Sequence, residues 1–112
     1  MRDISWNRAA FKAFMKFPIE VRERMSAGLE AVLQGKFPEI AKPLKGFDSG
    51  VYELAMRHRG NAWRTVYALK IDDDVWVLHA FQKKSTEGIK TSKLDIDLIE
   101  TRLSLLRRNA NG

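Results

Sequence analysis

With 112 residues, 45% of them hydrophobic, the chain is long enough for one packed domain, residues 1–112, and too short for two cores. The absence of cysteine excludes disulfides and thiolate metal sites. A formal charge of +6 favours a polyanionic partner, although many small soluble proteins are basic without one. No stretch approaches the roughly 18 apolar residues of a membrane span, and the N-terminus lacks the core of a signal peptide, so we expect a cytoplasmic protein without a membrane partner.

The first third of the chain predicts two short helices that form a hairpin. Residues 2–5 can add a short edge strand, and residues 7–17 place Phe14 and other apolar side chains on one helical stripe. Pro18 suits the first turn of a second helix, and Gly35 is a natural stop. The apolar residues of the second helix recur at helical spacing: Val21, Met25, Leu29, Val32 and Leu33.

The middle of the chain predicts an antiparallel sheet. Residues 36–50 hold two Pro and two Gly and should form a loop. Strands are expected at 51–57, 62–71 and 75–82. The turns between them are short, at 58–61 and at the aspartate run 72–74, which indicates a meander of antiparallel neighbours.

A C-terminal helix should begin at Ser92, with Asp95 three residues later as in a capping box. Its expected apolar face consists of Leu94, Leu98, Ile99, Leu103 and Leu106. The predicted class is therefore α+β: an N-terminal helical hairpin packed on a small twisted antiparallel sheet of three to four strands, with a C-terminal helix.

Alternation along the strands sorts their side chains onto two faces. In the third strand, Trp76, Leu78, Ala80 and Gln82 belong to the nearly apolar set that should pack on the helices. The other set contains Val75, Val77, His79 and Phe81. Because that second set also carries Arg57 and Arg64 on the neighbouring strands, we expect an open cationic face with one histidine.

The predicted face offers candidate groups for phosphate chemistry. Arg57 and Arg64 are expected to be cross-strand neighbours on adjacent strands, roughly 5 Å apart, and so to flank one phosphate, unless they form a solvated face with Glu53 as partner. His79 either moves a proton or is a packed residue with one satisfied hydrogen bond. Lysines follow the third strand, where they either bind an anion or only add solubility: Lys83, Lys84, Lys90 and Lys93.

The residue types limit the reaction that this face can perform. The run 72–74 reads as a turn, and with no other ligand cluster evident we expect no metal and no cofactor. RNA supplies its own nucleophile, the 2′-hydroxyl, so a protein needs only a base, an acid and charge stabilisation. A set of Arg, Lys and His without a metal therefore suits cleavage of an RNA phosphodiester.

The chain also resembles a known family along nearly its whole length. The motifs that carry the resemblance are IAKPLKGFDSGVYEL at 40–54, WRTVYAL at 63–69, VWVLHAFQKKS at 75–85, GIKT at 88–91 and DIDLIETRL at 95–103. In their order and spacing they resemble the HigB-like, phage-derived branch of the RelE/ParE toxin superfamily of type II toxin–antitoxin systems.

The resemblance implies a RelE-like fold and a toxin that inhibits translation as an mRNA endoribonuclease. Cleavage would need no metal, would usually occur on the translating ribosome, and would proceed by 2′-hydroxyl attack. The partners implied are mRNA on the ribosome and a cognate antitoxin, often a helix-turn-helix protein of the HigA-like kind.

Carried over position by position, the resemblance assigns Arg64 to transition-state stabilisation and matches Lys84, with Lys83, to the basic position after the next strand. His79 and Arg57 occupy the face on which other members place base and phosphate-binding groups. Lys45, in the PLKG motif, is a candidate RNA or ribosome contact, beside the loop lysines Lys90 and Lys93.

The sequence departs from the family pattern at two functional positions. The first sheet strand carries Glu53 and Ala55 where RelE has catalytic lysines, and residues 85–112 contain no Tyr. His79 is then the first choice for the general base. Two alternatives stay open: a ParE-like toxin that inhibits gyrase without nuclease activity, and a non-catalytic RNA-binding protein.

Overall fold

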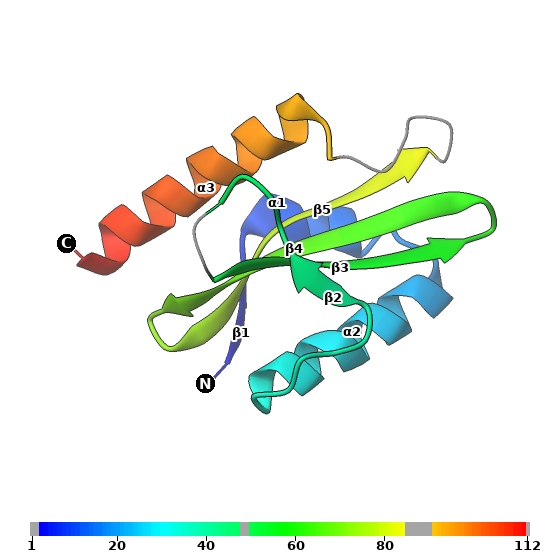
Figure 1. Ribbon diagram of the computed structural model, residues 1–112, viewed down its shortest axis with the longest axis horizontal. Coiled ribbons are helices and arrows are strands. Elements are labelled where there is room, and N and C mark those ends of the chain that lie inside the picture. Colours follow the sequence, from blue (N-terminus) through cyan, green and yellow to red (C-terminus); the bar gives the residue numbers. More distant parts are fainter. Residues whose placement is uncertain (1–2, 48–49, 85–90, 112) are drawn as a thin grey trace.

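Eight helices and strands follow one another in the computed structural model, whose described residues are 3–47, 50–84 and 91–111 (Figure 1). In chain order they are β1 (Ile4–Trp6), α1 (Arg8–Phe14), α2 (Ile19–Leu33), β2 (Ala41–Pro43), β3 (Val51–His58), β4 (Asn61–Ile71), β5 (Asp74–Lys84) and α3 (Lys93–Asn111). The helices pack on both faces of a single sheet. This arrangement confirms the predicted α+β class, with a helical hairpin first and a helix last.

The first two helices begin and end where local chemistry favours it. The Asn7 side chain accepts a hydrogen bond from the backbone N–H of Ala10 (3.0 Å), as a helix cap does. Helix α1 ends at Phe14, three residues before the predicted end. The predicted last residue, Phe17, precedes Pro18 and is therefore disfavoured in helical conformation. The predicted stripe on α2 is buried as expected at Val21, Met25, Leu29 and Val32.

The sheet has five strands in the order β1-β5-β4-β3-β2. Strands β3, β4 and β5 form the predicted antiparallel meander. Both turns contain two consecutive residues with positive φ, Arg59–Gly60 and Asp72–Asp73, which matches the twist of tight hairpins. The expected N-terminal edge strand is present as β1, but it pairs with β5 in parallel and not antiparallel. Strand β2 forms within the expected loop and pairs with β3, so the sheet has five strands and not the predicted three to four.

A bulge in β5 changes the predicted assignment of side chains to faces. Val66 lies opposite His79, whereas the next residue, Tyr67, lies opposite Val77, so Leu78 is an extra residue on β5. For the residues that precede His79 in β5, the predicted faces were therefore wrong. Val75 and Val77 pack toward α1 and α2, and Trp76 and Leu78 pack toward α3. Beyond the bulge, His79 and Phe81 face the same side as Arg64, as predicted.

Two hydrophobic cores lie on opposite faces of the sheet. The first joins α1 and α2 to Leu54, Trp63 and Tyr67, and the second joins α3 to Val66 and Leu78. Helix α3 therefore covers part of the face that was expected to be open. Figure 1 shows α3 and α2 on opposite sides of the strands, and α3 contacts β4 and β5.

Helix α3 also presents a different side to the sheet than its leucines predicted. Leu94 and Leu98 are 83% and 38% exposed, so the predicted apolar face was wrong at these two positions. The side chains that pack on the sheet are Ile96, Ile99, Leu103 and Leu106. The helix has leucines on more than one side, and its contacts with β5 select the side that is buried.

Within the described residues, no helix is long and apolar enough to cross a membrane.

Candidate functional site on the α3 side of the sheet

The pairing of β3, β4 and β5 sets the candidate groups in rows across the sheet. The three rows are Arg57–Ala62–Lys83, Ala55–Arg64–Phe81 and Glu53–Val66–His79. Arg64 is at the centre of the middle row, and the four ionisable residues occupy the diagonal positions around it. Diagonal neighbours on one face of a sheet are about 7–8 Å apart, within reach of long side chains. The sheet therefore gathers one acidic, one imidazole and two cationic side chains around Arg64.

Arg64 is buried and held by a carboxylate. Arg64 is only 6% exposed, and its Nη1 donates a hydrogen bond to Oε1 of Glu53 (2.9 Å). Glu53 is 2% exposed and also pairs with Nζ of Lys42 (3.4 Å) from the edge strand β2. The alternative weighed from the sequence, a pairing with Glu53, is found for Arg64, but the pair lies inside the protein and not on a solvated face. A buried guanidinium fixed on one side is a preorganised hydrogen-bond donor.

Arg57 lies at the exposed end of the same face. In the pairing of β3 with β4 it is opposite Ala62, and Arg64 is opposite Ala55, so the two arginines are diagonal neighbours. The expectation that they are direct cross-strand neighbours was therefore wrong. Arg57 is exposed whereas Arg64 is buried, so Arg57 is accessible to a ligand that approaches the turn end of the hairpin.

The predicted lysines are distributed over three parts of the chain. Lys83 lies within β5 opposite Ala62 and is 6% exposed, so it is a buried diagonal neighbour of Arg64 and not, as predicted, a residue that follows the strand. Lys84 ends β5 opposite Asn61, and its side chain lies outside the described part. Lys45 is exposed just after β2, and Lys93 pairs with Asp97 at the exposed start of α3 (3.4 Å). Lys90 lies outside the described residues.

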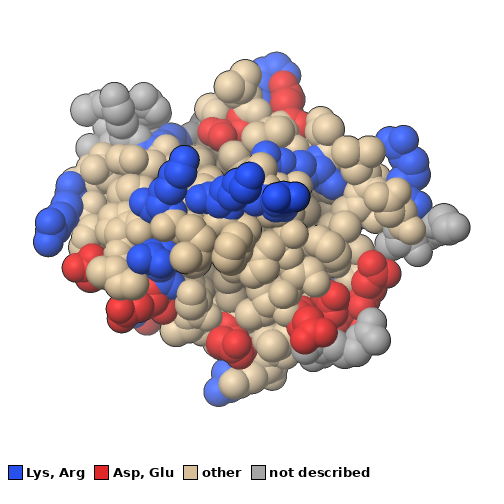
Figure 2. Space-filling view, turned by 180° about the vertical axis from the view of Figure 1, so that it is seen from behind, with Lys and Arg blue, Asp and Glu red and all other residues tan. Residues whose placement is uncertain are grey.

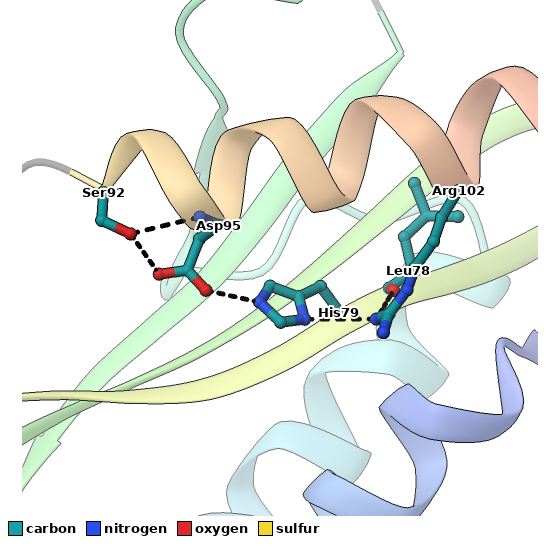
Figure 3. A network of polar contacts seen from close by, with 5 residues as sticks. All are labelled: Leu78, His79, Ser92, Asp95 and Arg102. Atoms are coloured by element: carbon teal, nitrogen blue, oxygen red, sulfur yellow. Dashed lines mark hydrogen bonds and ion pairs between the residues drawn. The ribbon is translucent and has the colours of Figure 1, made fainter.

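His79 is bound on both sides by residues of α3 (Figure 3). Its Nε2 lies 2.7 Å from Oδ1 of Asp95, and its Nδ1 lies 3.2 Å from Nη1 of Arg102. Arg102 also donates to the backbone carbonyl of Leu78 (2.8 Å), the bulge residue. Burial lowers the pKa of His79, with a further lowering by Arg102, whereas the hydrogen bond and charge of Asp95 act in the opposite direction.

The predicted cap of α3 is part of the same network. The Ser92 hydroxyl donates to Oδ2 of Asp95 (2.6 Å), and the backbone N–H of Asp95 donates to Oγ of Ser92 (3.2 Å). Sequence reasoning identified Ser92 and Asp95 as a cap but missed their link to His79, and it missed Arg102 entirely. Asp95 and Arg102 are seven residues apart and so lie on one side of the helix. This spacing is the sequence feature that indicated that both could contact the same strand.

Positive charge alone does not distinguish this site. Figure 2, which views the molecule from behind Figure 1, shows Lys and Arg side chains in a band across that side. Exposed cationic residues also occur on α1, which packs on the other face of the sheet, for example Arg8 and Lys12. What distinguishes the α3 side is the burial and fixed geometry of its charged groups.

Over residues 3–47, 50–84 and 91–111, no three His, Asp or Glu side chains are grouped so as to hold a metal ion.

The fold and the family follow from comparison with known proteins. The crystal structure of the isolated E. coli RelE toxin is similar over 88% of this chain and 95% of its own, with a TM-score of 0.58 and 21% sequence identity. The chain therefore has the RelE fold, as the sequence predicted. A family model described as phage derived protein Gp49-like (DUF891) matches residues 12–104, and the chain belongs to this family. No curated protein is significantly similar to the chain.

Proposed function

We propose that the protein is a HigB-like toxin of a type II toxin–antitoxin system that inhibits translation by cleaving mRNA without a metal ion. The single observation that carries the proposal is Arg64: a buried guanidinium fixed by Glu53, with Arg57 and Lys83 diagonal to it on one face of a RelE fold. Membership of the phage-derived Gp49-like family supports the same assignment.

The geometry fits in-line attack by the RNA 2′-hydroxyl on the adjacent phosphorus. In this reaction a bond forms from the 2′-oxygen to phosphorus, the bond to the 5′-oxygen breaks, and the products are a 2′,3′-cyclic phosphate and a 5′-hydroxyl. Arg64 stabilises the charge that develops on the phosphorane, and the exposed Arg57 binds the phosphate. Lys83 and Lys84 hold the scissile phosphate and supply the proton for the 5′-oxygen.

His79 was predicted to be the general base, the group that takes the proton from the 2′-hydroxyl. Because both ring nitrogens already contact α3, His79 must release Asp95 or Arg102 before it accepts a proton from the 2′-hydroxyl. Its role as general base therefore stays a prediction. A lysine amine of this face is the other group that can move a proton when its surroundings lower its pKa.

The proposed partners are translating ribosomes and a cognate antitoxin. The formal charge of +6 suits ribosome-bound mRNA in the cytoplasm, and exposed Lys45 and Lys93 are candidate contacts with RNA. By family resemblance the antitoxin is a helix-turn-helix protein of the HigA-like kind, which neutralises the toxin by covering this face and represses the operon.

The proposal is tested by inducing the chain in cells and mapping mRNA 5′ ends. We expect growth arrest and new 5′-hydroxyl ends with the parent, and neither with Arg64→Ala. Arg24→Ala, which removes an exposed arginine from α2 on the other side of the sheet, is the matched control and should behave as the parent. Circular dichroism of each purified variant checks that it folds.

Two results would contradict the proposal. Growth arrest without new 5′-hydroxyl ends excludes the nuclease, and an accompanying loss of DNA supercoiling would assign the toxicity to gyrase. New ends that persist at the parental level in a folded Arg64→Ala variant would place the active site elsewhere.

A further inference from the structure

The contacts of His79 define which form of its ring is present. A guanidinium has hydrogen-bond donors and no acceptor, so Nδ1 of His79 must accept from Arg102 and carries no proton. The proton of the neutral ring is then on Nε2 and is donated to Asp95. A second proton on Nδ1 would remove the acceptor and place two cations against each other. His79 is therefore a neutral Nε2–H imidazole, with both nitrogens engaged and the residue 8% exposed.

These contacts fasten α3 to the sheet at two points. Asp95 is in the first turn of the helix, and Arg102 follows seven residues later, about 10 Å along the helix axis. Arg102 binds the Nδ1 of His79 and the carbonyl of Leu78 with the same nitrogen. Figure 3 shows that the ring of His79 lies between the two helix residues, so one side chain of β5 bridges them.

The same ring also contacts the side chain that lies next to Arg64. The rings of His79 and Phe81 are stacked, with centroids 4.8 Å apart and an angle of 21° between their planes. Phe81 is directly opposite Arg64 in the pairing of β4 with β5. Contacts therefore lead from α3 through His79 to Phe81, the residue that lies across the strands from Arg64.

We propose that His79 is a positioning residue: its neutral ring clamps α3 onto β5 and holds Phe81 in place opposite Arg64 in the sheet. It does not exchange a proton with RNA, because neither nitrogen is available in the clamped state. The effect on cleavage rests on the proposed function, whereas the clamp itself exists with or without nuclease activity. The two claims therefore need separate readouts.

Two substitutions of His79 separate a clamp from a proton-transfer group. His79→Gln keeps a donor and an acceptor at the end of the side chain but cannot take up a proton near neutral pH. His79→Phe keeps the ring and removes both polar contacts. If His79 positions α3, we expect His79→Gln to retain cleavage within about threefold of the parent and His79→Phe to lose about tenfold or more.

The structural readout is amide hydrogen exchange along α3, which requires no RNA. We expect His79→Phe to lower protection of the α3 amides by about 10- to 100-fold, since hydrogen bonds to two charged groups are lost, and His79→Gln to lower it less. Asp95→Ala and Arg102→Ala, which remove the acceptor and the donor that contact the ring, should resemble His79→Phe. Asp97→Ala and Arg108→Ala remove the same charges at exposed positions of α3 and should resemble the parent.

A direct spectroscopic signature completes the test. In ¹⁵N spectra of the purified chain we expect His79 to show a protonated Nε2 and an unprotonated Nδ1 at neutral pH. An Nδ1–H tautomer, or α3 exchange that His79→Phe leaves unchanged, would overturn the clamp. Loss of cleavage in His79→Gln with parental α3 protection would show that His79 moves a proton instead. If the parent does not cleave RNA at all, the proposed function fails, and the exchange and ¹⁵N data still decide the clamp.

Discussion

The two faces of the sheet bury very different kinds of side chain. Toward α1 and α2 the core is apolar and aromatic, with Phe17 packed on Phe14 and on Trp63 at centroid distances of 5.5 and 4.8 Å. Among the described residues, five polar or charged residues are buried: Glu53, Arg64, Thr65, His79 and Lys83. All except Thr65, which contacts Met25 of α2, lie toward α3.

This asymmetry separates stability from function within one sheet. Burying apolar area stabilises a fold, whereas burying a charge does so only when its partners are in place. The α1 and α2 side therefore has the composition of a structural core. The α3 side holds charges that an apolar core would not need, and this is the property expected of a site.

The largest loss of stability should follow from a cavity in the apolar core between the sheet and helices α1 and α2. Phe17→Ala removes a buried ring from between Phe14 and Trp63, and we expect the free energy of unfolding to fall by about 3–5 kcal/mol. Urea denaturation measures it. Phe37→Ala, at a position 62% exposed, is the control and should lower it by less than about 1 kcal/mol. Equal losses in the two variants would contradict the assignment of the core.

On the α3 side, removing one member of the buried ion pair should be nearly as harmful. Glu53→Ala leaves Arg64 as a buried charge without its carboxylate, and we expect a loss of about 3 kcal/mol in unfolding free energy. Replacing both residues, Glu53→Leu with Arg64→Leu, should recover most of that loss while abolishing RNA cleavage. A double variant that still cleaves would show that these charges serve the fold alone.

A smaller effect should appear in the pH dependence of stability. The pKa of His79 is lowered in the folded protein by burial and by Arg102, against the opposing effect of Asp95. Below its unfolded value of about 6.5 the unfolded chain binds a proton that the folded protein does not, so stability falls as the pH decreases from 6.5. Denaturation between pH 7.5 and 5.5 measures this slope, and His79→Phe should reduce it. An unchanged slope in His79→Phe would assign the effect to other groups.

The smallest effect is expected at the edge of the same charge cluster. Lys42 pairs with Glu53, but its side chain is 54% exposed, so solvent screens the interaction. We expect Lys42→Ala to lower the unfolding free energy by at most about 1 kcal/mol, much less than Glu53→Ala. A loss as large as that of Glu53→Ala would mean that Lys42, and not Arg64, holds the buried carboxylate.

Much of the fold could be predicted because its signals are local. The alternation in β3 and β4 placed Arg64 and Arg57 on one face, and the aspartate run at 72–74 indicated a tight turn. The apolar period of α2 predicted its buried stripe correctly, and Ser92 was correctly identified as the cap of α3. Each of these features depends on residues within a few positions of one another.

The features that sequence reasoning missed depend on contacts between distant segments. The Leu78 bulge reversed the faces of Val75 to Leu78, and nothing within β5 alone requires an extra residue there. The parallel pairing of β1 with β5 joins residues about 70 positions apart in the chain. The burial of Arg64 depends on Glu53 across the hairpin, and the orientation of α3 depends on Arg102. The number of lysines and arginines in the sequence does not reveal which of these side chains are buried.

The central claim is that the α3 face, organised around Arg64, cleaves RNA. The most direct test maps 5′-hydroxyl mRNA ends after induction of the parent and of Arg64→Ala, with Arg24→Ala as the matched control. The account predicts new ends with the parent and the control, and none with a folded Arg64→Ala protein. Equal cleavage by Arg64→Ala and the parent would contradict it.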